Sequence, residues 1–263
     1  MITSTSNSLV KRIRKLGQKK FRKKEGVGFV EGLRGVLTAA EYTPQLIEKV
    51  IIAPELLTGN RGEFRLRELV PSNDIIEFSA DVFQAVSGRE NPAGMGAIVQ
   101  TPLKELTDFD PPTANSRYVI LDRLGDPGNL GTIIRTADAA GVDSVILVGH
   151  GVDVMHPAAL KASLGTIFTM PVCMATVDEL TRWQKENHVE LIGTSAKADL
   201  LHSEMQMTGP AGLLLGNERE GLSEPLAQLA NTMVRIPMRG QASSLNVSVA
   251  AGILMYHCAW QDQ

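Results

Sequence analysis

Three stretches of the chain combine glycine, small polar side chains and the end of an apolar run, a composition suited to holding a ligand. They lie at residues 122–141 (DRLGDPGNLGTIIRTADAAG), 213–223 (LLLGNEREGLS) and 235–260 (RIPMRGQASSLNVSVAAGILMYHCAW). Each follows or contains the end of a short strand-like segment. In open α/β sheets, ligands bind beyond the carboxyl ends of the strands. The three stretches are therefore candidates for one shared site.

The third stretch is predicted to be a strand end, a polar loop and a helix that is apolar on most of its circumference. Ser244 can cap such a helix by accepting a bond from a first-turn amide. A helix apolar all round must be buried, either in a core or against a second subunit. A capped core helix does not explain the polar side chains of Ser244, Asn246 and Ser248 on this segment, because buried polar groups require partners, and a ligand is one kind of partner.

The first two stretches carry charged side chains beside glycine turns. The first lacks both the lysine of a P-loop and the GxGxxG spacing, which argues against a nucleotide phosphate site and against a dinucleotide-dependent oxidoreductase. Arg135 follows Asn129 by six residues and could project toward the strand end, although a surface ion pair is the commoner arrangement for arginine. In the second stretch, Gly216 and Gly221 enclose a tight loop that holds Glu218 at its mouth.

The elements that must position these residues alternate along the second part of the chain. Strands are expected at 118–122, 144–148, 171–174, 190–193, 212–215 and 233–236, and helices at 131–140, 157–168 and 177–187. Such alternation predicts a parallel sheet covered on both faces by helices. Residues 117–263 are therefore expected to form one α/β domain.

The first hundred residues are predicted to form a smaller α/β unit. Helices are expected near 8–16, 33–41, 63–69 and 81–86, and strands at 28–32, 49–53, 75–78 and 96–100. The segment 101–116 is polar, contains three prolines and has no sustained periodicity. It is predicted to link domain 1–100 to domain 117–263.

The charge of the chain is distributed unevenly. The 263 residues carry 26 basic and 29 acidic side chains, yet nine of the basic ones lie between residues 11 and 24, and no acid precedes Glu25. Without these nine, the chain would hold 17 basic against 29 acidic residues, a net charge of −12. A concentrated positive field most simply meets a polyanion, so nucleic acid is the expected partner; the alternative is a solvated helix face that only aids solubility.

Two cysteines, Cys173 and Cys258, show neither metal-binding nor redox spacing, so we expect reduced thiols, no metal and a cytoplasmic location. No signal-type apolar segment opens the sequence, and the helix after Leu245 is too short and too polar at its start to cross a bilayer. We therefore expect no membrane association.

The three stretches together resemble the motifs of the SpoU/TrmH-type RNA 2′-O-ribose methyltransferases of the SPOUT superfamily. NLGTIIRTA (129–137), GNEREG (216–221) and IPMRGQASSLNVSVA (236–250) match these motifs in order and spacing. The similarity is strong over about 117–260. The amino-terminal unit is similar, more weakly, to the ribosomal-protein-like substrate-binding domain of many rRNA-modifying members. KASLGTIF (161–168) also resembles a family segment, with Lys161 where many members have arginine.

The resemblance implies an α/β-knot, a parallel sheet whose carboxy-terminal segment threads through a loop as a trefoil knot, which general topology rules would reject. It implies a homodimer packed through the knot region and S-adenosylmethionine as cofactor. The residues it assigns to the cofactor, largely through main-chain groups, are Gly216, Ile236, Leu245, Thr194, Asn217 and Met238. Those it assigns to catalysis and substrate positioning are Asn129, Arg135, Glu218, Ser244 and Asn246.

The implied reaction requires the ribose hydroxyl to lose its proton as it attacks the methyl carbon in line. The family proposal makes Arg135 the base, whereas an arginine is normally protonated, so Arg135 could instead stabilise the developing alkoxide. Ribosomal RNA is favoured over tRNA because compact tRNA-directed members tend to lack the amino-terminal domain. A non-catalytic RNA-binding protein of the same fold is the other alternative, and the complete set of polar site residues argues against it.

Overall fold

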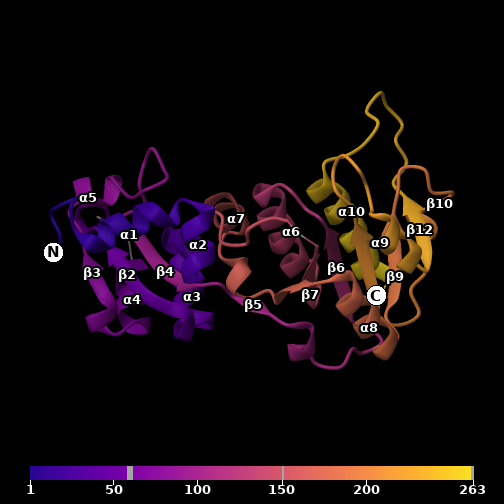
Figure 1. The fold of residues 1–263 in the computed structure, drawn as a ribbon, viewed down its shortest axis with the longest axis horizontal. Helices are drawn as coiled ribbons and strands as arrows, with labels where there is room; N and C mark the ends of the chain where they lie inside the picture. Colours follow the sequence, from indigo (N-terminus) through magenta and orange to yellow (C-terminus); the bar gives the residue numbers. More distant parts are fainter. Residues whose placement is uncertain (58–61, 150, 262–263) are drawn as a thin grey trace. The chain divides into compact units, whose positions relative to one another are not determined.

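The computed structural model describes residues 1–57, 62–149 and 151–261, with side chains up to residue 258 (Figure 1). Its contacts divide the chain into two compact units. The first consists of Met1–Pro102 together with Asp153–Thr169, and the second of Leu103–Val152 together with Met170–Gln263. The first unit is therefore built from two separate pieces of sequence.

The first unit contains a four-stranded mixed sheet in the order β1-β4-β2-β3. Strand β4 runs antiparallel to β1 and β2, and β3 runs parallel to β2. Its strands are β1 (Val27–Glu31), β2 (Ile47–Ile52), β3 (Ile75–Glu77) and β4 (Met95–Gln100). Its α-helices are α1 (Ser8–Leu16), α2 (Lys19–Glu25), α3 (Leu33–Tyr42), α4 (Gly62–Leu69), α5 (Ala80–Gln84) and α7 (Pro157–Ser163), and its 3-10 turns are η1 (Pro44–Leu46), η2 (Pro54–Leu56), η3 (Ser72–Asp74) and η5 (Thr166–Phe168).

Helix α1 buries Val10, Ile13 and Leu16 on one face. Its cap is Asn7, whose side-chain oxygen accepts the Leu9 amide at 2.8 Å. Ser8, which follows it, is the first helical residue. Both residue types suit the cap position, and here the non-helical backbone precedes the serine.

Arg22 and Arg12, two cations of the 11–24 cluster, form ion pairs with carboxylates of the first unit. Arg22 is 3% exposed and donates both to Asp153, at 2.7 and 2.8 Å, and to the carbonyl oxygen of Leu16, at 2.7 Å. Arg12 pairs with Glu25 and Glu48. Arg22 therefore fastens the segment Asp153–Thr169 to the first unit.

The second unit contains an eight-stranded sheet in the order β10-β12-β9-β11-β6-β7-β8-β5. Each neighbouring pair of strands is parallel, which confirms the prediction. The strands are β5 (Leu103–Lys104), β6 (Arg117–Asp122), β7 (Ser144–Val148), β8 (Val172–Ala175), β9 (Glu190–Thr194), β10 (Leu200–Leu201), β11 (Ala211–Leu215) and β12 (Thr232–Arg235). The helices are α6 (Pro127–Ala139), α8 (Val177–Glu186), α9 (Glu224–Leu229) and α10 (Val247–Gln261), with 3-10 turns η4 (Leu106–Asp108) and η6 (His202–Glu204).

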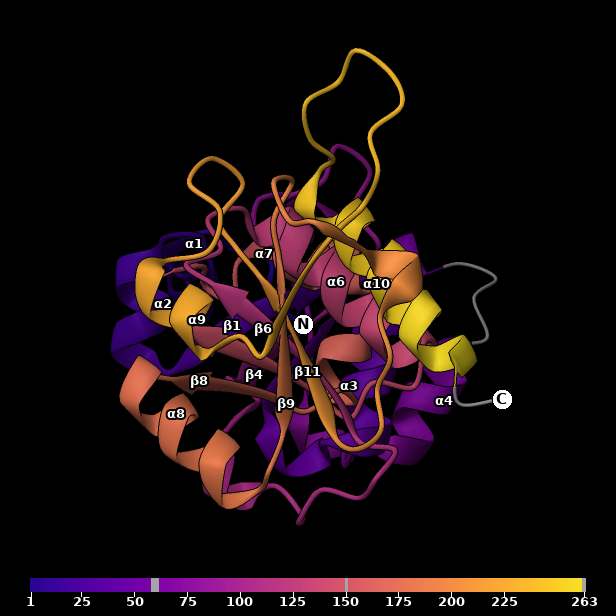
Figure 2. The same cartoon turned by 90° about the vertical axis from the view of Figure 1, so that its right-hand side faces the viewer.

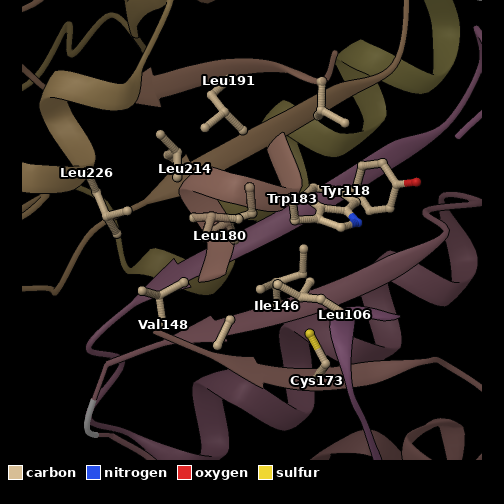
Figure 3. Close-up of a cluster of buried hydrophobic side chains, with 13 residues drawn as sticks. Leu106, Tyr118, Ile146, Val148, Cys173, Leu180, Trp183, Leu191, Leu214 and Leu226 are labelled. Carbon is tan, nitrogen blue, oxygen red and sulfur yellow. The ribbon is translucent and has the colours of Figure 1, made fainter. Parts of the chain in front are cut away.

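Helices cover both faces of this sheet, with α8 and α9 on one side and α6 and α10 on the other (Figure 2). Alternate strand residues point toward α8 and α9, where Tyr118 and Trp183 meet edge to face with ring centroids 4.9 Å apart (Figure 3). Side chains of β6, β7, β8, β9 and β11 join this cluster. The sheet is therefore a buried platform whose carboxyl edge can hold a site rigidly.

Within the segment 101–116, predicted as a linker, residues 103–116 belong to the second unit. Its strand β5 pairs in parallel with β8, and η4 is closed by reciprocal bonds between Glu105 and Asp108. Two strand residues are too few to produce a periodic pattern, which explains why the sequence suggested only a linker.

Helix α10 begins at Val247, two residues later than the start near Leu245 expected from the sequence. Asn246 acts at its start: its side-chain oxygen accepts the Ser248 amide at 2.8 Å and the Ser248 hydroxyl at 2.6 Å. The cap expected at Ser244 is therefore wrong, and Ser244 remains in the loop. None of the described helices has the length and apolar character needed to cross a bilayer.

Candidate active site

A cavity of about 550 Å³ lies in the second unit, where β9, β11 and β12 end and the first turns of α10 begin. Its lining comes from residues 194–197, 215–222, 233–236 and 243–245, together with Ala227, Met238, Val247, Ala250 and Leu254. Eight of the eleven predicted site residues line it: Thr194, Gly216, Asn217, Glu218, Ile236, Met238, Ser244 and Leu245. The second and third candidate stretches therefore converge on one cavity, as the sequence predicted.

The loop 216–221 is closed by its own backbone. Asn217 and Gly221 exchange two main-chain hydrogen bonds of 3.0 and 2.9 Å, and Gly221 has a φ of +73°. A Cβ on Gly216 would lie 2.5 Å from the carbonyl oxygen of Gly221 and closer still to the amide nitrogen of Leu222. Glycine is therefore required at 216 because the loop folds back onto it.

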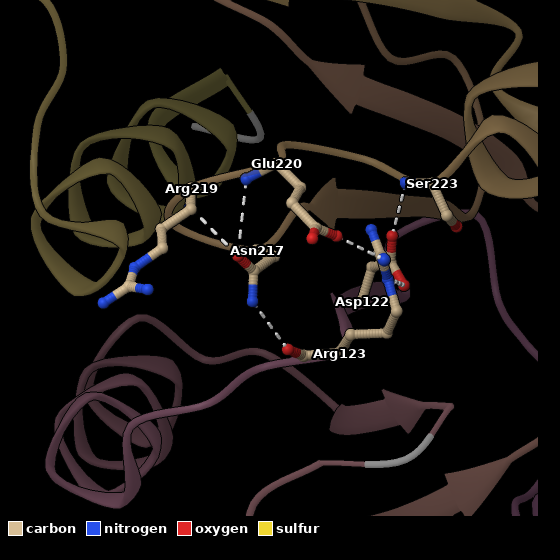
Figure 4. Close-up of polar contacts among 6 residues, drawn as sticks. All are labelled: Asp122, Arg123, Asn217, Arg219, Glu220 and Ser223. Atoms are coloured by element: carbon tan, nitrogen blue, oxygen red, sulfur yellow. Dashed lines mark hydrogen bonds and ion pairs between the residues drawn. The ribbon is translucent and has the colours of Figure 1, made fainter.

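Polar contacts fix this loop to the end of β6 (Figure 4). The Asn217 side-chain amide donates to the carbonyl oxygen of Arg123 at 3.0 Å, and its oxygen accepts the Arg219 amide at 2.9 Å. Arg123 also donates to Glu220 at 2.6 Å and to Asp122 at 3.2 Å. The hydrogen bond to Asp122 is the main cause of a raised pKa of Arg123.

Asp122 and Arg123 were not predicted as site residues. Asp122 is 2% exposed, and its second oxygen accepts the backbone amide of Ser223, just after the loop. Arg123 adopts a left-handed backbone with φ of +49°, which is costly for a side chain other than glycine. A buried aspartate at the end of an apolar strand was the available signal, since such a carboxylate needs partners.

Asn129 links the other two stretches to the first. Its side-chain amide donates to Glu218 at 3.0 Å, and its side-chain oxygen accepts from Asn246 at 3.0 Å. Asp126 positions it by capping α6, with its carboxylate accepting the Asn129 amide at 2.7 Å. Asn129 and Asn246 do not line the cavity themselves, yet through Glu218 they join one polar network at its edge.

Among the described residues, Arg135 is the predicted site residue that neither lines the cavity nor joins the polar network at its edge. It is exposed on α6 and does not line the cavity. Within the described residues, the Arg135 side chain has no hydrogen-bond or ion-pair partner. At roughly 100° per residue, six residues place it about 120° around the helix axis from Asn129. Its catalytic role stays a prediction.

The chemistry of the lining fits S-adenosylmethionine. That molecule carries a sulfonium, an ammonium and a carboxylate on an adenosine, so its site needs apolar surface and charges of both signs. Apolar side chains such as Leu222 and Leu254 line the cavity, with Glu218 and Glu220 beside Lys197, Arg219 and Arg235. Thr194 also lines it, and its hydroxyl donates to the carbonyl oxygen of Leu214 at 2.9 Å. The volume lies within the range of small-molecule sites.

The fold and the site place the chain in a known class. Residues 116–256 match the SpoU rRNA Methylase family, and residues 7–97 match the MRM3-like substrate binding domain. The chain belongs to the SpoU rRNA methylase family. The expected α/β fold, with an amino-terminal substrate-binding unit before a parallel-sheet domain, is confirmed.

Similar proteins cover nearly the whole chain. The 23S rRNA (guanosine(2553)-2′-O)-methyltransferase RlmP of Bacillus subtilis (strain 168) is 32% identical over 97% of this chain and 98% of its own length. The 23S rRNA (uridine(2479)-2′-O)-methyltransferase of Streptomyces viridochromogenes is 32% identical over 94% of this chain and 87% of its own length. The crystal structure of an AdoMet-bound rRNA methyltransferase from Sinorhizobium meliloti superposes with a TM-score of 0.88, at 33% identity, over 99% of this chain and 97% of that one.

Proposed function

We propose that this protein transfers a methyl group from S-adenosylmethionine to a ribose 2′-hydroxyl of RNA, with 23S-type ribosomal RNA as the substrate. The observation that carries the proposal is the network Glu218–Asn129–Asn246, which joins three distant stretches at one charged cavity. Two full-length relatives are named 23S rRNA 2′-O-methyltransferases, one for guanosine and one for uridine. These names support ribosomal RNA over tRNA and leave the base open.

The cofactor would be held by the cavity residues Gly216, Ile236 and Leu245 through main-chain groups, with Thr194, Asn217 and Met238 beside them. When bound, S-adenosylmethionine supplies an electrophilic methyl group on its sulfonium sulfur. Two main-chain hydrogen bonds between Asn217 and Gly221 close the loop 216–221 and give this cradle a fixed shape. A rigid cradle orients the donor, and orientation of two reactants supplies much of the rate in such transfers.

The polar network would position the sugar. Glu218 has one side-chain oxygen bonded to Asn129 and lines the cavity, so its carboxylate is presented in a fixed orientation. Ser244 lines the same cavity from the loop before α10. Arg135 either removes the hydroxyl proton or stabilises the alkoxide that develops. Arg135→Lys separates these roles: retained activity with a shifted pH profile identifies a base, and complete loss at every pH identifies charge delocalisation and geometry.

A homodimer packed through α10 and a knotted carboxy-terminal segment is part of the proposal. Helix α10 and the residue before its cap leave an apolar stripe exposed: Leu245 (37%), Val249 (50%), Ile253 (37%) and Tyr256 (44%). A second copy of this chain would cover this stripe. The helix, which is apolar on most of its circumference, would then be buried on that side as well. Helix α6 packs along α10, and a Cβ on Gly252 would lie 3.6 Å from Thr136. Arg135, one residue before Thr136, would then serve the cavity of the partner protomer.

Mixed dimers test this arrangement. Arg135→Ala and Gly216→Val are each expected to abolish methyl transfer as homodimers. A heterodimer of the two variants keeps one complete site if Arg135 acts on the partner's cavity, so about half of the wild-type activity returns. If Arg135 acts on its own cavity, the heterodimer stays inactive. A monomer by sedimentation at working concentration would refute the dimer itself.

The basic cluster of the first unit would contact the RNA backbone. Four exposed lysines lack side-chain partners among the described residues, namely Lys11, Lys20, Lys23 and Lys24. About four phosphate contacts give a slope of log affinity against log salt of roughly −3. Replacing all four lysines by glutamine should flatten it. Deleting residues 1–24 would be a poor test, because Val10, Ile13 and Leu16 belong to the core.

The decisive experiment is methyl transfer from labelled S-adenosylmethionine to RNA of cells lacking the gene, followed by mapping of 2′-O-methyl groups. Transfer to one 23S rRNA nucleotide is expected. Transfer to tRNA alone would refute the substrate, and RNA binding without any transfer would indicate a non-catalytic RNA-binding protein. We also propose a cytoplasmic location, supported by the RNA substrate and by two buried cysteines without a disulfide.

A further inference from the structure

A second cavity, of about 320 Å³, lies within the first unit and is separate from the candidate active site. Its walls come from α1, β1, residues 86–89 and residues 155–161. Two glycines shape it. A Cβ on Gly28 would lie 2.9 Å from Met155, and a Cβ on Gly96 would lie closer still to the ring of Phe29. Their missing side chains let Met155 and Phe29 occupy the cavity wall.

The single carboxylate in this lining, Glu31, is already satisfied by the protein. One of its oxygens accepts the Ser87 hydroxyl at 2.6 Å and the other accepts the Gly88 amide at 3.1 Å. Arg89 lies 3.8 Å from the same side chain and donates to the Glu31 carbonyl oxygen at 2.8 Å. Glu31 therefore orders residues 87–89 and neutralises one cation.

Two further cations line the cavity with their charge uncompensated. Arg14 uses its Nε atom on the carbonyl oxygen of Ala85 at 3.0 Å, and its terminal nitrogens have no partner in the described part of the chain. Lys161 likewise has no side-chain partner among the described residues. The cavity thus combines an aromatic and aliphatic interior with a net positive lining, in the unit that matches a substrate binding domain.

We propose that this cavity binds one unpaired nucleotide of the RNA substrate. The base lies in the apolar interior beside Phe29, and its phosphate meets Lys161 and Arg14. Proteins recognise single-stranded RNA by this combination, stacking splayed bases on aromatic rings and pairing phosphates with cations. The identity of the RNA rests on the proposed function, whereas the nucleotide site rests on the lining of the cavity alone.

The test uses the full-length protein saturated with S-adenosylhomocysteine, so that the candidate active site is filled. Binding of uridine and adenosine 5′-monophosphate is followed by ligand-observed NMR. Lys161→Glu reverses a cation at the cavity, and Gly88→Phe fills the cavity at a position where a Cβ meets nothing within 4 Å. Arg34→Glu is the matched control, because Arg34 is an exposed cation of α3 outside the lining.

Both cavity variants should weaken nucleotide binding about tenfold or more, the loss expected for a charged hydrogen bond or a filled site, while Arg34→Glu stays within about twofold. Lys161→Glu should also raise the KM for RNA. Nucleotide affinity unchanged in both cavity variants would overturn the proposal, and so would inorganic phosphate competing as well as the nucleotide. Failure of the proposed function gives a different result: methyl transfer is absent in the wild type, while the pattern of nucleotide binding persists.

Discussion

Gly216→Ala offers the sharpest test of how the proposed cofactor cradle is built. The new Cβ would lie 2.5 Å from the carbonyl oxygen of Gly221, whereas real Cβ contacts essentially never fall below 3.0 Å. The loop must therefore move by at least about 0.5 Å, and by more at its closer contact with Leu222, where the obstacle is backbone that has no alternative rotamer.

The expected cost follows from what that movement breaks. Opening the loop weakens the two hydrogen bonds between Asn217 and Gly221, about 1 kcal/mol each, and overpacking adds about 1–3 kcal/mol. We expect the free energy of unfolding to fall by about 3–5 kcal/mol. Affinity for S-adenosylhomocysteine should fall more than tenfold, because the displaced backbone lines the cavity.

Two other glycines separate the possible causes. Gly221→Ala has open space but a φ of +73°, so it should cost about 1–2 kcal/mol through backbone strain alone. Gly240→Ala has open space and no positive φ, so stability should change by less than about 0.5 kcal/mol. Urea unfolding and calorimetric titration provide both readouts. Equal stability and equal ligand affinity in Gly216→Ala and Gly240→Ala would refute the close-approach argument.

Three further outcomes follow from the described contacts. Arg22→Ala should lower the urea unfolding free energy by about 3–5 kcal/mol, since it leaves Asp153 without its buried partner, and a loss below about 1 kcal/mol would contradict this. Burial raises the pKa of Cys173 to about 12, so the native thiol should resist alkylation at pH 8. Because the thiol of the unfolded chain ionises at lower pH than the native one, the free energy of unfolding should decline from about pH 9 upward. The decline should be smaller in Cys173→Ala. Asn129→Ala should reduce kcat/KM about 30-fold by breaking two side-chain bonds, with ligand affinity nearly unchanged in titrations; wild-type turnover would show that the network does not position Glu218.

The large elements of the fold were predictable because their patterns are local. Six apolar runs separated by helical segments predicted the parallel sheet, and β6, β7 and β9 lie within two residues of their expected limits. The two-residue strands β5 and β10 leave no periodic signal. Helix α2 was hidden because its sequence, KKFRKKE, has no apolar stripe and its buried residue is Arg22. No local pattern can reveal that this arginine has a partner 131 residues away.

Side-chain orientation limited what could be predicted for the site. Strand ends and glycines predicted that residues 216–221 and 236–245 meet, since parallel strands deliver their carboxyl ends to one edge. Serine and asparagine both suit the cap position, so the sequence could not decide between Ser244 and Asn246. The cap is set by the residue at which the loop ends and helical backbone begins. Helical geometry alone predicts that the side chains of Asn129 and Arg135 point in different directions from α6. The motif match nevertheless assigned both residues to one site.

The division of the first unit between Met1–Pro102 and Asp153–Thr169 has a consequence for the order in which the protein can fold during synthesis. When Pro102 leaves the ribosome, all four strands of that unit have been translated. Asp153, which pairs with Arg22, and Met155, which packs against Gly28, have not yet been made. About fifty residues of the second unit must be made first. A chimera that takes only residues 1–102 from a relative would therefore lack part of the first unit. A functional exchange must also transfer the segment Asp153–Thr169.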